Sequence, residues 1–89
     1  MRAVITVTGK DSKGIIAKVS GECYKYNVNI LDISQSVLSD FFAMSMLADV
    51  SEMSIAFTDF VDSMSALGSS CGLAIYTMHE DIFNAMHRV

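Results

Sequence analysis

One stretch, at positions 9–32, constrains the fold of this chain more than any other, because it links two strand-like runs through a polar turn and a helical pattern. A β-branched run at 4–8 leads into it, and a second such run begins at Ile30. Between the two runs, apolar residues recur at three- and four-residue spacing, which is typical of a helix with one buried face. The stretch therefore predicts a strand, a reversing turn, a helix of about three turns and a second strand.

The turn at 9–14 carries the chemical interest of this stretch. It brings the end of a strand up to the start of a helix, where the first backbone N–H groups lack internal partners and the helix dipole is positive. Such a place can hold a carboxylate or a phosphate without any catalytic side chain. Asp11 or Ser12 is expected to cap a helix over 13–26, and Asn27, which tolerates a left-handed conformation, is expected to end it.

Alternating and helical patterns continue along the rest of the chain. The predicted strands are 2–8, 29–38, 41–50 and 73–78, the second helix is 55–70, and a tail at 79–89 restarts a short helical pattern. The strand at 29–38 is predicted to be half-buried with a polar outer face. The order β-α-β-β-α-β predicts an α+β fold of the ferredoxin-like type, a four-stranded antiparallel sheet with two helices on one face and a short C-terminal helical tail.

Length and composition limit the class of protein. Eighty-nine residues make a single domain, 1–89. Hydrophobic residues make up 52% of the chain and charged residues 18%, which is apolar for so small a domain. Two explanations remain open. One is a well-filled, Met-rich core. The other, which we favour, is a further buried surface formed by self-association, because exposed apolar patches usually mark interfaces.

Charge and hydropathy argue against several function classes. The net charge of −4 gives no basic footprint for nucleic acid. Uninterrupted apolar stretches are too short for a membrane span, and the first residues lack the pattern of a signal peptide, so a cytoplasmic protein is expected. Cys23 and Cys71 form no CxxC pair and are expected to be reduced, buried thiols.

The sequence shows no residue pattern that predicts catalysis or a cofactor. Ser-His-Asp, Cys-His and paired-carboxylate arrangements at meaningful spacing are missing from it. Two histidines and two carboxylates gather at 79–87, but a helix there would separate His79 from His87, so exposed tail residues are expected rather than a metal site. We therefore expect a protein that is not an enzyme and needs neither metal nor cofactor.

The first half of the chain also resembles a known family. The segment that carries the resemblance is GKDSKGIIAKVSGECYKYNVNILDIS, which is similar to the ACT-domain signature G-x-D-x-x-G-I-I/V-A-x-V/I-S/A-…-N-I/V-x-D. ACT domains are small ligand-binding regulatory modules, often specific for amino acids. With the segments DISQSVL, F-x-M-x-M and DIFxxMH, essentially the whole chain resembles the single-domain bacterial and archaeal ACT proteins grouped as an uncharacterised family.

The resemblance implies an assembly as well as a fold. It implies a strand order of 4-1-3-2 and paired subunits, either side by side in an eight-stranded sheet or back to back. It also implies an effector amino acid at the subunit interface, between the turn after the first strand of one copy and the start of the second strand of its neighbour. Gly14 matches the glycine at the helix start, the family's most characteristic residue. A homodimer is therefore expected.

The chemistry of such a site can be assigned from the residues. The N–H groups from Ser12 to Ile15 suit the carboxylate of an α-amino acid, because Gly14 has no side chain to obstruct it. Asp11 is the nearest acceptor in sequence for the ammonium, and the other candidates are side-chain oxygens near the start of the second strand. The predicted ligand-binding residues are Asp11, Ser12, Lys13, Gly14, Ile15, Asn27, Asn29, Ile30 and Asp32.

The same residues are also compatible with a chain that binds no ligand. Gly14 then only lets the helix pack closely on the sheet, Asp11 only caps the helix, and Asn27 only ends it. In that case the chain is a protein-interaction module that acts through a partner enzyme or a transcriptional regulator. The expected partners are thus a second copy, an amino-acid effector or a regulatory protein, and neither nucleic acid nor a membrane.

Overall fold

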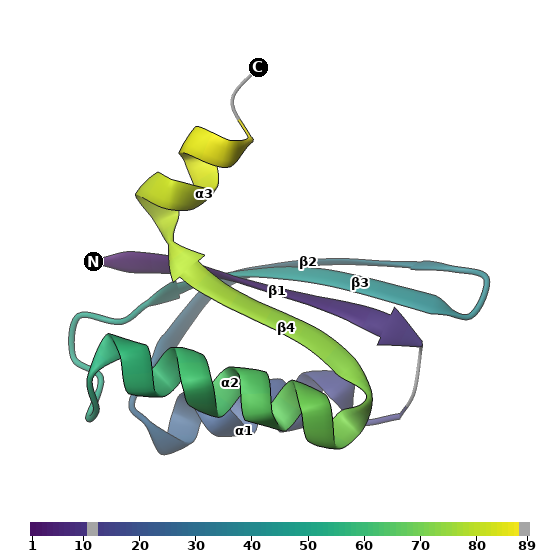
Figure 1. The fold of residues 1–89 in the computed structure, drawn as a ribbon, viewed down its shortest axis with the longest axis horizontal. Helices are drawn as coiled ribbons and strands as arrows, with labels where there is room; N and C mark the ends of the chain where they lie inside the picture. Colours follow the sequence, from purple (N-terminus) through teal and green to yellow (C-terminus); the bar gives the residue numbers. More distant parts are fainter. Residues whose placement is uncertain (11–12, 88–89) are drawn as a thin grey trace.

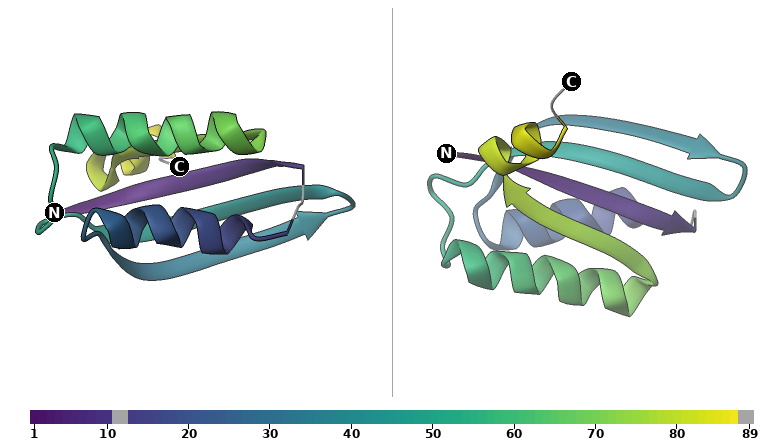
Figure 2. Two further views of the ribbon diagram at one scale, coloured as in Figure 1. Left: turned by 90° about the horizontal axis from the view of Figure 1, so that it is seen from below. Right: turned by 45° about the horizontal axis from the view of Figure 1, so that its top comes forward.

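The computed structural model describes residues 1–10 and 13–87 of the chain. Its elements are β1 (Arg2–Lys10), α1 (Ile15–Lys25), β2 (Asn29–Leu38), β3 (Phe41–Asp49), α2 (Phe57–Cys71), β4 (Leu73–His79) and α3 (Glu80–Met86). The strands form a four-stranded antiparallel sheet in the order β2-β3-β1-β4, with α1 and α2 on one face and α3 on the other (Figure 1, Figure 2). The predicted ferredoxin-like fold is confirmed, as is the strand order that the resemblance implied. None of the helices in these two ranges is long and apolar enough to cross a membrane.

The core lies between the sheet and the helices α1 and α2. Alternate residues of β1, namely Ala3, Ile5 and Val7, are completely buried, because successive side chains of a strand point to opposite faces. Alternate residues of β3 from Phe42 to Ala48 continue this buried layer. The helices close the core with Ile15, Val19, Cys23, Phe60 and Met64. This packing fixes the end of β1 relative to the start of α1.

Helix α2 approaches β4 closely at Gly68. A Cβ atom at this position would lie 2.7 Å from the backbone oxygen of Leu73 and 2.9 Å from Cγ1 of Ile75. Both distances are too short for carbon in a packed interior. Glycine is therefore required here by the contact between α2 and the sheet, and not by the backbone conformation of the helix.

The prediction of a half-buried strand at 29–38 is wrong. Every residue of β2 except Ile30 is exposed. The physical reason is position: β2 is an edge strand, and the hairpin that it forms with β3 reaches beyond α1 and α2 (Figure 1). Side chains that alternate correctly for burial, such as Ile33 and Val37, are therefore 39% and 53% exposed, because the chain places no helix over this part of the edge.

A β-bulge at Leu31 changes the alternation near the start of β2. Ile30 pairs with Ala48 and Asp32 pairs with Leu47, so two residues of β2 span one step of β3. An extra residue of this kind reverses the side to which all later side chains point. Ile30 consequently lies on the helix side of the sheet, whereas Asp32 lies on the opposite side.

The turn between β2 and β3 is a two-residue loop. Leu38 pairs with Phe41, and Ser39 adopts a φ of 59° between them. A two-residue hairpin loop needs positive φ values that match the twist of its strands, and Ser39 supplies one although it is not glycine or asparagine. The pairing of β2 with β3 therefore continues without a shift from this turn to the bulge at Leu31.

Candidate functional site

The turn after β1 presents Gly14 as the N-cap residue of α1. Its φ of 82° and ψ of 11° are left-handed, a conformation that glycine adopts at little cost. The helix begins at Ile15, so the predicted start at 13 is wrong, because a left-handed residue cannot continue a right-handed helix. Asp11 and Ser12, the predicted caps, lie outside the described residues; the N-cap position is occupied by Gly14, which has no side chain to cap with.

The space beside Gly14 is open. A Cβ atom there would meet only Cε of Lys18, at 4.0 Å, so close packing of the helix start on the sheet does not explain this glycine. The first hydrogen bond of α1 runs from Lys18 N to Gly14 O at 2.9 Å. The amide groups of the first turn precede that bond and lack intrahelical acceptors. Together with the positive end of the helix dipole, they can bind an anion.

A hollow of about 300 Å³ lies between the start of α1 and the edge strand β2. Its lining residues are Gly14, Ile15, Ile16, Ala17, Gln35, Val37 and Phe42. Ile16, whose spacing predicts a buried position, is 38% exposed because it faces this hollow rather than the core. The start of α1 thus combines backbone donors that lack intrahelical acceptors with an apolar surface that is open on the side of β2.

Three of the other predicted residues lie at the far end of α1. Asn27 has a φ of 59° and ends the helical segment, as predicted. Its side-chain Nδ2 also donates a hydrogen bond to the backbone oxygen of Glu52, at 2.9 Å. Asn29 is the exposed first residue of β2, and Ile30 is half-buried against the core. Asn27 therefore has a structural role, and it keeps its side-chain oxygen available as an acceptor.

Within one copy, the predicted ligand-binding residues do not meet. The described ones form three groups: Lys13, Gly14 and Ile15 at the start of α1; Asn27, Asn29 and Ile30 at its end; and Asp32 on the opposite face of the sheet. A helix of 11 residues is about 16 Å long. An amino acid is much shorter, so a single ligand cannot contact both ends of α1 in the same copy.

A larger hollow, of about 510 Å³, lies at the far end of α1. It is lined by Tyr24, Asn27, Val28, Asn29, Asp49, Ser51 and Glu52. Of these residues, the predicted ligand-binding set includes only the two asparagines. The sequence did contain a signal for the other lining residues. Antiparallel pairing of 29–38 with 41–50 necessarily brings the end of the later strand beside the start of the earlier one.

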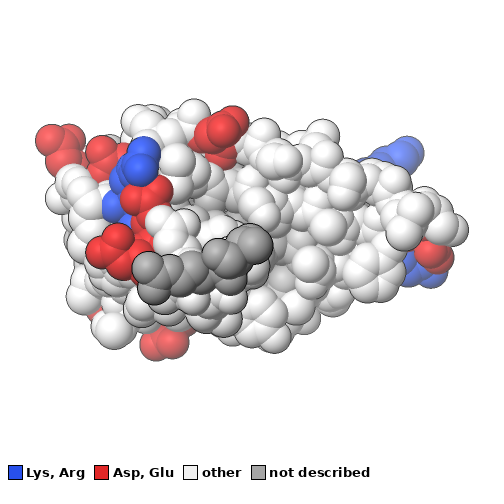
Figure 3. Space-filling model, turned by 90° about the horizontal axis from the view of Figure 1, so that it is seen from above, with Lys and Arg blue, Asp and Glu red and all other residues white. Residues whose placement is uncertain are grey.

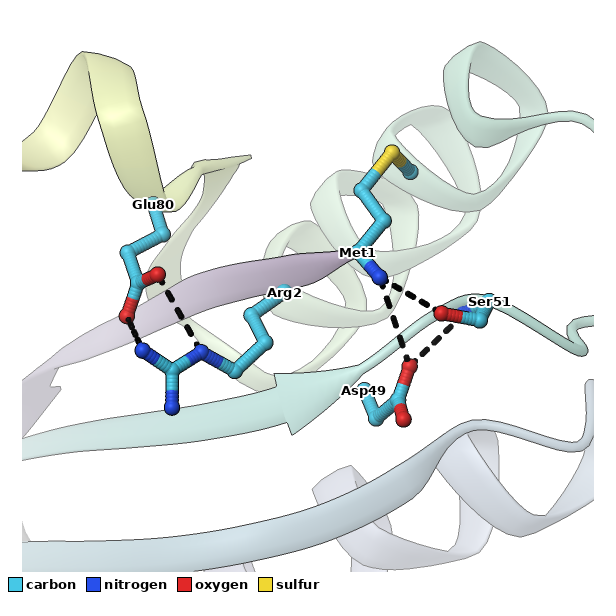
Figure 4. A network of polar contacts seen from close by, with 5 residues as sticks. All are labelled: Met1, Arg2, Asp49, Ser51 and Glu80. Carbon is cyan, nitrogen blue, oxygen red and sulfur yellow. Dashed lines mark hydrogen bonds and ion pairs between the residues drawn. The ribbon is translucent and has the colours of Figure 1, made fainter.

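Asp49 gives this second hollow a negative charge. The backbone N–H of Ser51 donates to Asp49 Oδ1 at 2.9 Å, and the amino group of Met1 donates to Ser51 Oγ at 2.6 Å and lies 3.9 Å from Asp49 Oδ1 (Figure 4). Hydrogen bonds from Ser51, the side chain first and then the backbone, lower the pKa of Asp49 below its ordinary value. The carboxylate is therefore ionised at neutral pH and suits a cationic group.

Cys23 and the two histidines lie in surroundings that do not suggest chemistry. Burial raises the pKa of the Cys23 thiol to about 11, so this thiol stays protonated and is a poor nucleophile. The ring of His79 packs on Phe57 at 4.7 Å, and His87 stacks on Phe83 at 4.1 Å. Within 1–10 and 13–87, no three His, Cys, Asp or Glu side chains come together in a way that could hold a metal ion.

Comparisons with known proteins agree with this architecture. Residues 2–75 match a family model described as "ACT domain". A UPF0237 protein from Methanopyrus kandleri is 44% identical over 88 residues, which cover 99% of this chain and 98% of the relative. An ACT domain protein from Streptococcus pneumoniae of known structure is 39% identical, with a TM-score of 0.81 and 98% of each chain covered. A putative glycine cleavage system transcriptional repressor, 23% identical, shares the fold with a TM-score of 0.70 over 89% of this chain and 47% of its own.

Proposed function

The chain belongs to the ACT domain family, a family of small regulatory modules, and from this membership we propose that it senses an amino acid at the interface between two copies of itself. The observation that carries the proposal is the start of α1. Gly14 is left-handed and exposed, and a Cβ atom there would meet only Cε of Lys18 at 4.0 Å; the amide groups that follow it have no side-chain cap among the described residues. A small anion such as an α-carboxylate is the natural occupant of such a position.

A second copy would supply the other half of the site. β2 is a ten-residue edge strand whose only charged residue is Asp32, and edge strands of this kind are prone to pair with another chain. Antiparallel pairing of β2 with β2 of a second copy would extend the sheet to eight strands. The end of each β2, near Gly14, would then lie beside the start of the other, near Asn29.

The chemistry of an amino acid fits this composite site. Its carboxylate would accept hydrogen bonds from the first turn of α1 in one copy. Its ammonium would approach the second hollow of the other copy, where the side-chain oxygens of Asn27 and Asn29 and the carboxylate of Asp49 are available. Each charge-assisted hydrogen bond contributes about 1.5–3 kcal/mol. Two or three of them, less the cost of ordering the ligand, correspond to a dissociation constant of about 1 μM or weaker.

Titration calorimetry against the twenty amino acids tests the proposal. We expect saturable heat with one amino acid or a small group of related ones, and one ligand for each composite site, which is two ligands for each dimer. Heats indistinguishable from dilution into buffer for all twenty would contradict amino-acid sensing.

A second candidate function is a ligand-free interaction module that acts through a partner enzyme or transcriptional regulator. The exposed apolar side chains of β2 and α3 favour it, because such surfaces commonly mark protein interfaces. A thermal-shift screen separates the two functions. An effector at a hundred times its dissociation constant adds about 2.7 kcal/mol to the free energy of unfolding, whereas an interaction module is stabilised by its protein partner and by none of the metabolites.

A further inference from the structure

The hollow between the start of α1 and the edge strand β2, which we call the α1–β2 hollow, has an apolar wall. Its volume of about 300 Å³ is at the lower end of the sizes of small-molecule pockets. Helix α1 contributes Ile16 and Ala17 to the wall, and the sheet contributes Val37 and Phe42. Among the described residues that line the hollow, Gln35 alone has a polar side chain, and none is charged. The hollow therefore suits a small apolar group.

The register of β2 explains why this wall is apolar. Val37 pairs with Phe42, and Gln35 pairs with Met44. Directly opposite residues of an antiparallel pair lie on the same face of the sheet, and Phe42 and Met44 belong to the core. Val37 and Gln35 therefore lie on the helix side, in the part of the hairpin that reaches beyond α1 (Figure 1). The α1–β2 hollow continues the apolar layer of the core past the point where the helix ends.

The α1–β2 hollow adjoins the backbone donors at the start of α1. Gly14 and Ile15 line the hollow and also form the beginning of the helix. Cε of Lys18 lies 4.0 Å from the position of a Cβ at Gly14, so its ammonium group adds a positive charge at this point. In an α-amino acid the side chain is attached to the atom next to the carboxylate carbon. A ligand whose carboxylate binds the first turn of α1 can therefore extend its side chain into the hollow.

The distribution of charge argues against an ionised side chain in the hollow. Asp32, the only charged residue of β2, lies on the opposite side of the sheet. On the face that Figure 3 shows, a broad surface without charged side chains is flanked by charged residues at each end. A charged group placed against the apolar wall would lose its hydration and gain no partner from that wall. An aliphatic group gains free energy there, because its own surface and the wall both leave water.

We propose that the effector is an amino acid with an aliphatic side chain, such as valine, leucine, isoleucine or methionine, and that this side chain occupies the α1–β2 hollow. The assignment rests on the proposed function and adds the substituent that the function leaves open. The first turn of α1 binds the carboxylate, and the second hollow of the other copy receives the ammonium. Ile16 and Val37 are then the residues that determine which amino acid binds.

Pairing of two copies through β2 leaves the α1–β2 hollow accessible to the ligand. Such pairing uses the backbone groups on the free edge of β2, because the other edge is bonded to β3. The side chains of Gln35 and Val37 stand roughly perpendicular to the sheet, so they continue to line the hollow. The start of the second copy's β2 would lie near the open side and would exclude water from a bound side chain.

Amino acids of nearly the same shape test the proposal in titration calorimetry. Leucine, asparagine and aspartate differ mainly in whether the branched end of the side chain is apolar, polar or charged. We expect leucine to bind at least about tenfold more tightly than either of the others, because only its side chain gains from leaving water. Asparagine or aspartate binding as tightly as leucine would overturn the aliphatic assignment and leave amino-acid sensing intact. An absence of heat from all twenty amino acids would overturn both.

Ile16→Ser and Ile82→Ser form a matched pair of variants. Each removes a partly exposed isoleucine from a helix, but Ile82 lies on α3, away from the hollow. We expect Ile16→Ser to weaken leucine binding about 5- to 10-fold and to change alanine binding by less than about 2-fold, because alanine hardly enters the hollow. Ile82→Ser should leave both affinities unchanged.

Sedimentation of both variants should give the wild-type mass, which separates a loss of side-chain contact from a loss of pairing. If Ile16→Ser weakens leucine and alanine equally, the residue acts on the start of the helix and not on the ligand's side chain, and the assignment of the hollow is wrong.

Discussion

At the scale of single residues, glycines show what the sequence could and could not predict. Gly14 was identifiable from the turn and from the resemblance, but its role was not: only the φ of 82° and the open space beside it separate a backbone requirement from close packing. Gly68 gave no signal at all. The atoms that exclude a side chain there belong to Leu73 and Ile75, and their approach depends on how α2 crosses β4.

Gly14→Ala and Gly72→Ala form a matched pair of variants. Both residues are left-handed, with φ values of 82° and 72°, and neither has a neighbour that crowds an added Cβ. An alanine in this conformation costs about 1–2 kcal/mol at either position. We expect similar losses of thermal stability, but a loss of at least about tenfold in amino-acid affinity for Gly14→Ala alone. Equal affinities in calorimetry would count against a ligand at this turn.

Gly68→Ala and Gly21→Ala should change stability in opposite directions. At Gly68 the new methyl group would meet a backbone oxygen at 2.7 Å, and overpacking of this kind costs about 1–3 kcal/mol. At Gly21, within α1, an added Cβ has no neighbour within 4 Å, and alanine gains about 0.5–1 kcal/mol in a helix interior. Urea unfolding measures both. A stabilised Gly68→Ala would mean that α2 can move away from β4.

The raised pKa of the buried Cys23 thiol predicts a loss of stability at alkaline pH. Burial raises the pKa of its thiol from 9.0 to about 11 in the folded chain. Between these pH values the unfolded chain releases a proton that the folded chain retains. The thiol's contribution to the free energy of unfolding is therefore fully present below about pH 9 and is lost as the pH rises toward 11. Cys23→Ala should flatten the stability curve across that interval, although it lowers stability overall. An equally steep curve for this variant would assign the effect to other groups.

At the scale of elements, the patterns predicted which segments are strands and helices but not how β2 is buried. Alternation reports that a strand has two different faces, whereas burial depends on what lies above each face. β2 is at the sheet edge, so its apolar side chains remain exposed. The bulge at Leu31 left no mark in the sequence either, because an added residue disturbs the alternation only locally.

Ile33→Lys tests the role of the β2 edge. Ile33 is 39% exposed and lies near the middle of β2, so a lysine there should cost the single copy little stability. In a β2–β2 pair, the two lysines would face each other across the new boundary and repel. We expect weaker edge pairing by sedimentation and, with it, loss of amino-acid heat in calorimetry. Ala66→Lys on α2 is the control. Full ligand binding by a monomeric Ile33→Lys would place the whole site within one copy.

At the scale of the whole molecule, the apolar composition has two sources. The core accounts for one of them, as the completely buried residues of β1 and β3 show. The other is the exposed apolar surface of β2, the β2–β3 turn and α3, which the sequence indicated only as an excess of hydrophobic residues. The fold could be predicted from one chain because its patterns are local. The proposed site could not, because its two halves lie at opposite ends of α1 and would meet only between two copies.

The length of α1 has a consequence for how such a sensor would respond in a cell. If roughly 16 Å of helix keep the two halves of the site apart, an isolated chain has nothing complete to offer an effector. The response then depends on how much of the protein is made as well as on how much metabolite is present. At low expression the chain would not bind the effector, whereas at high expression, when copies can pair, it would bind the same concentration of effector. The amount of protein synthesised would therefore set the concentration at which the effector is sensed.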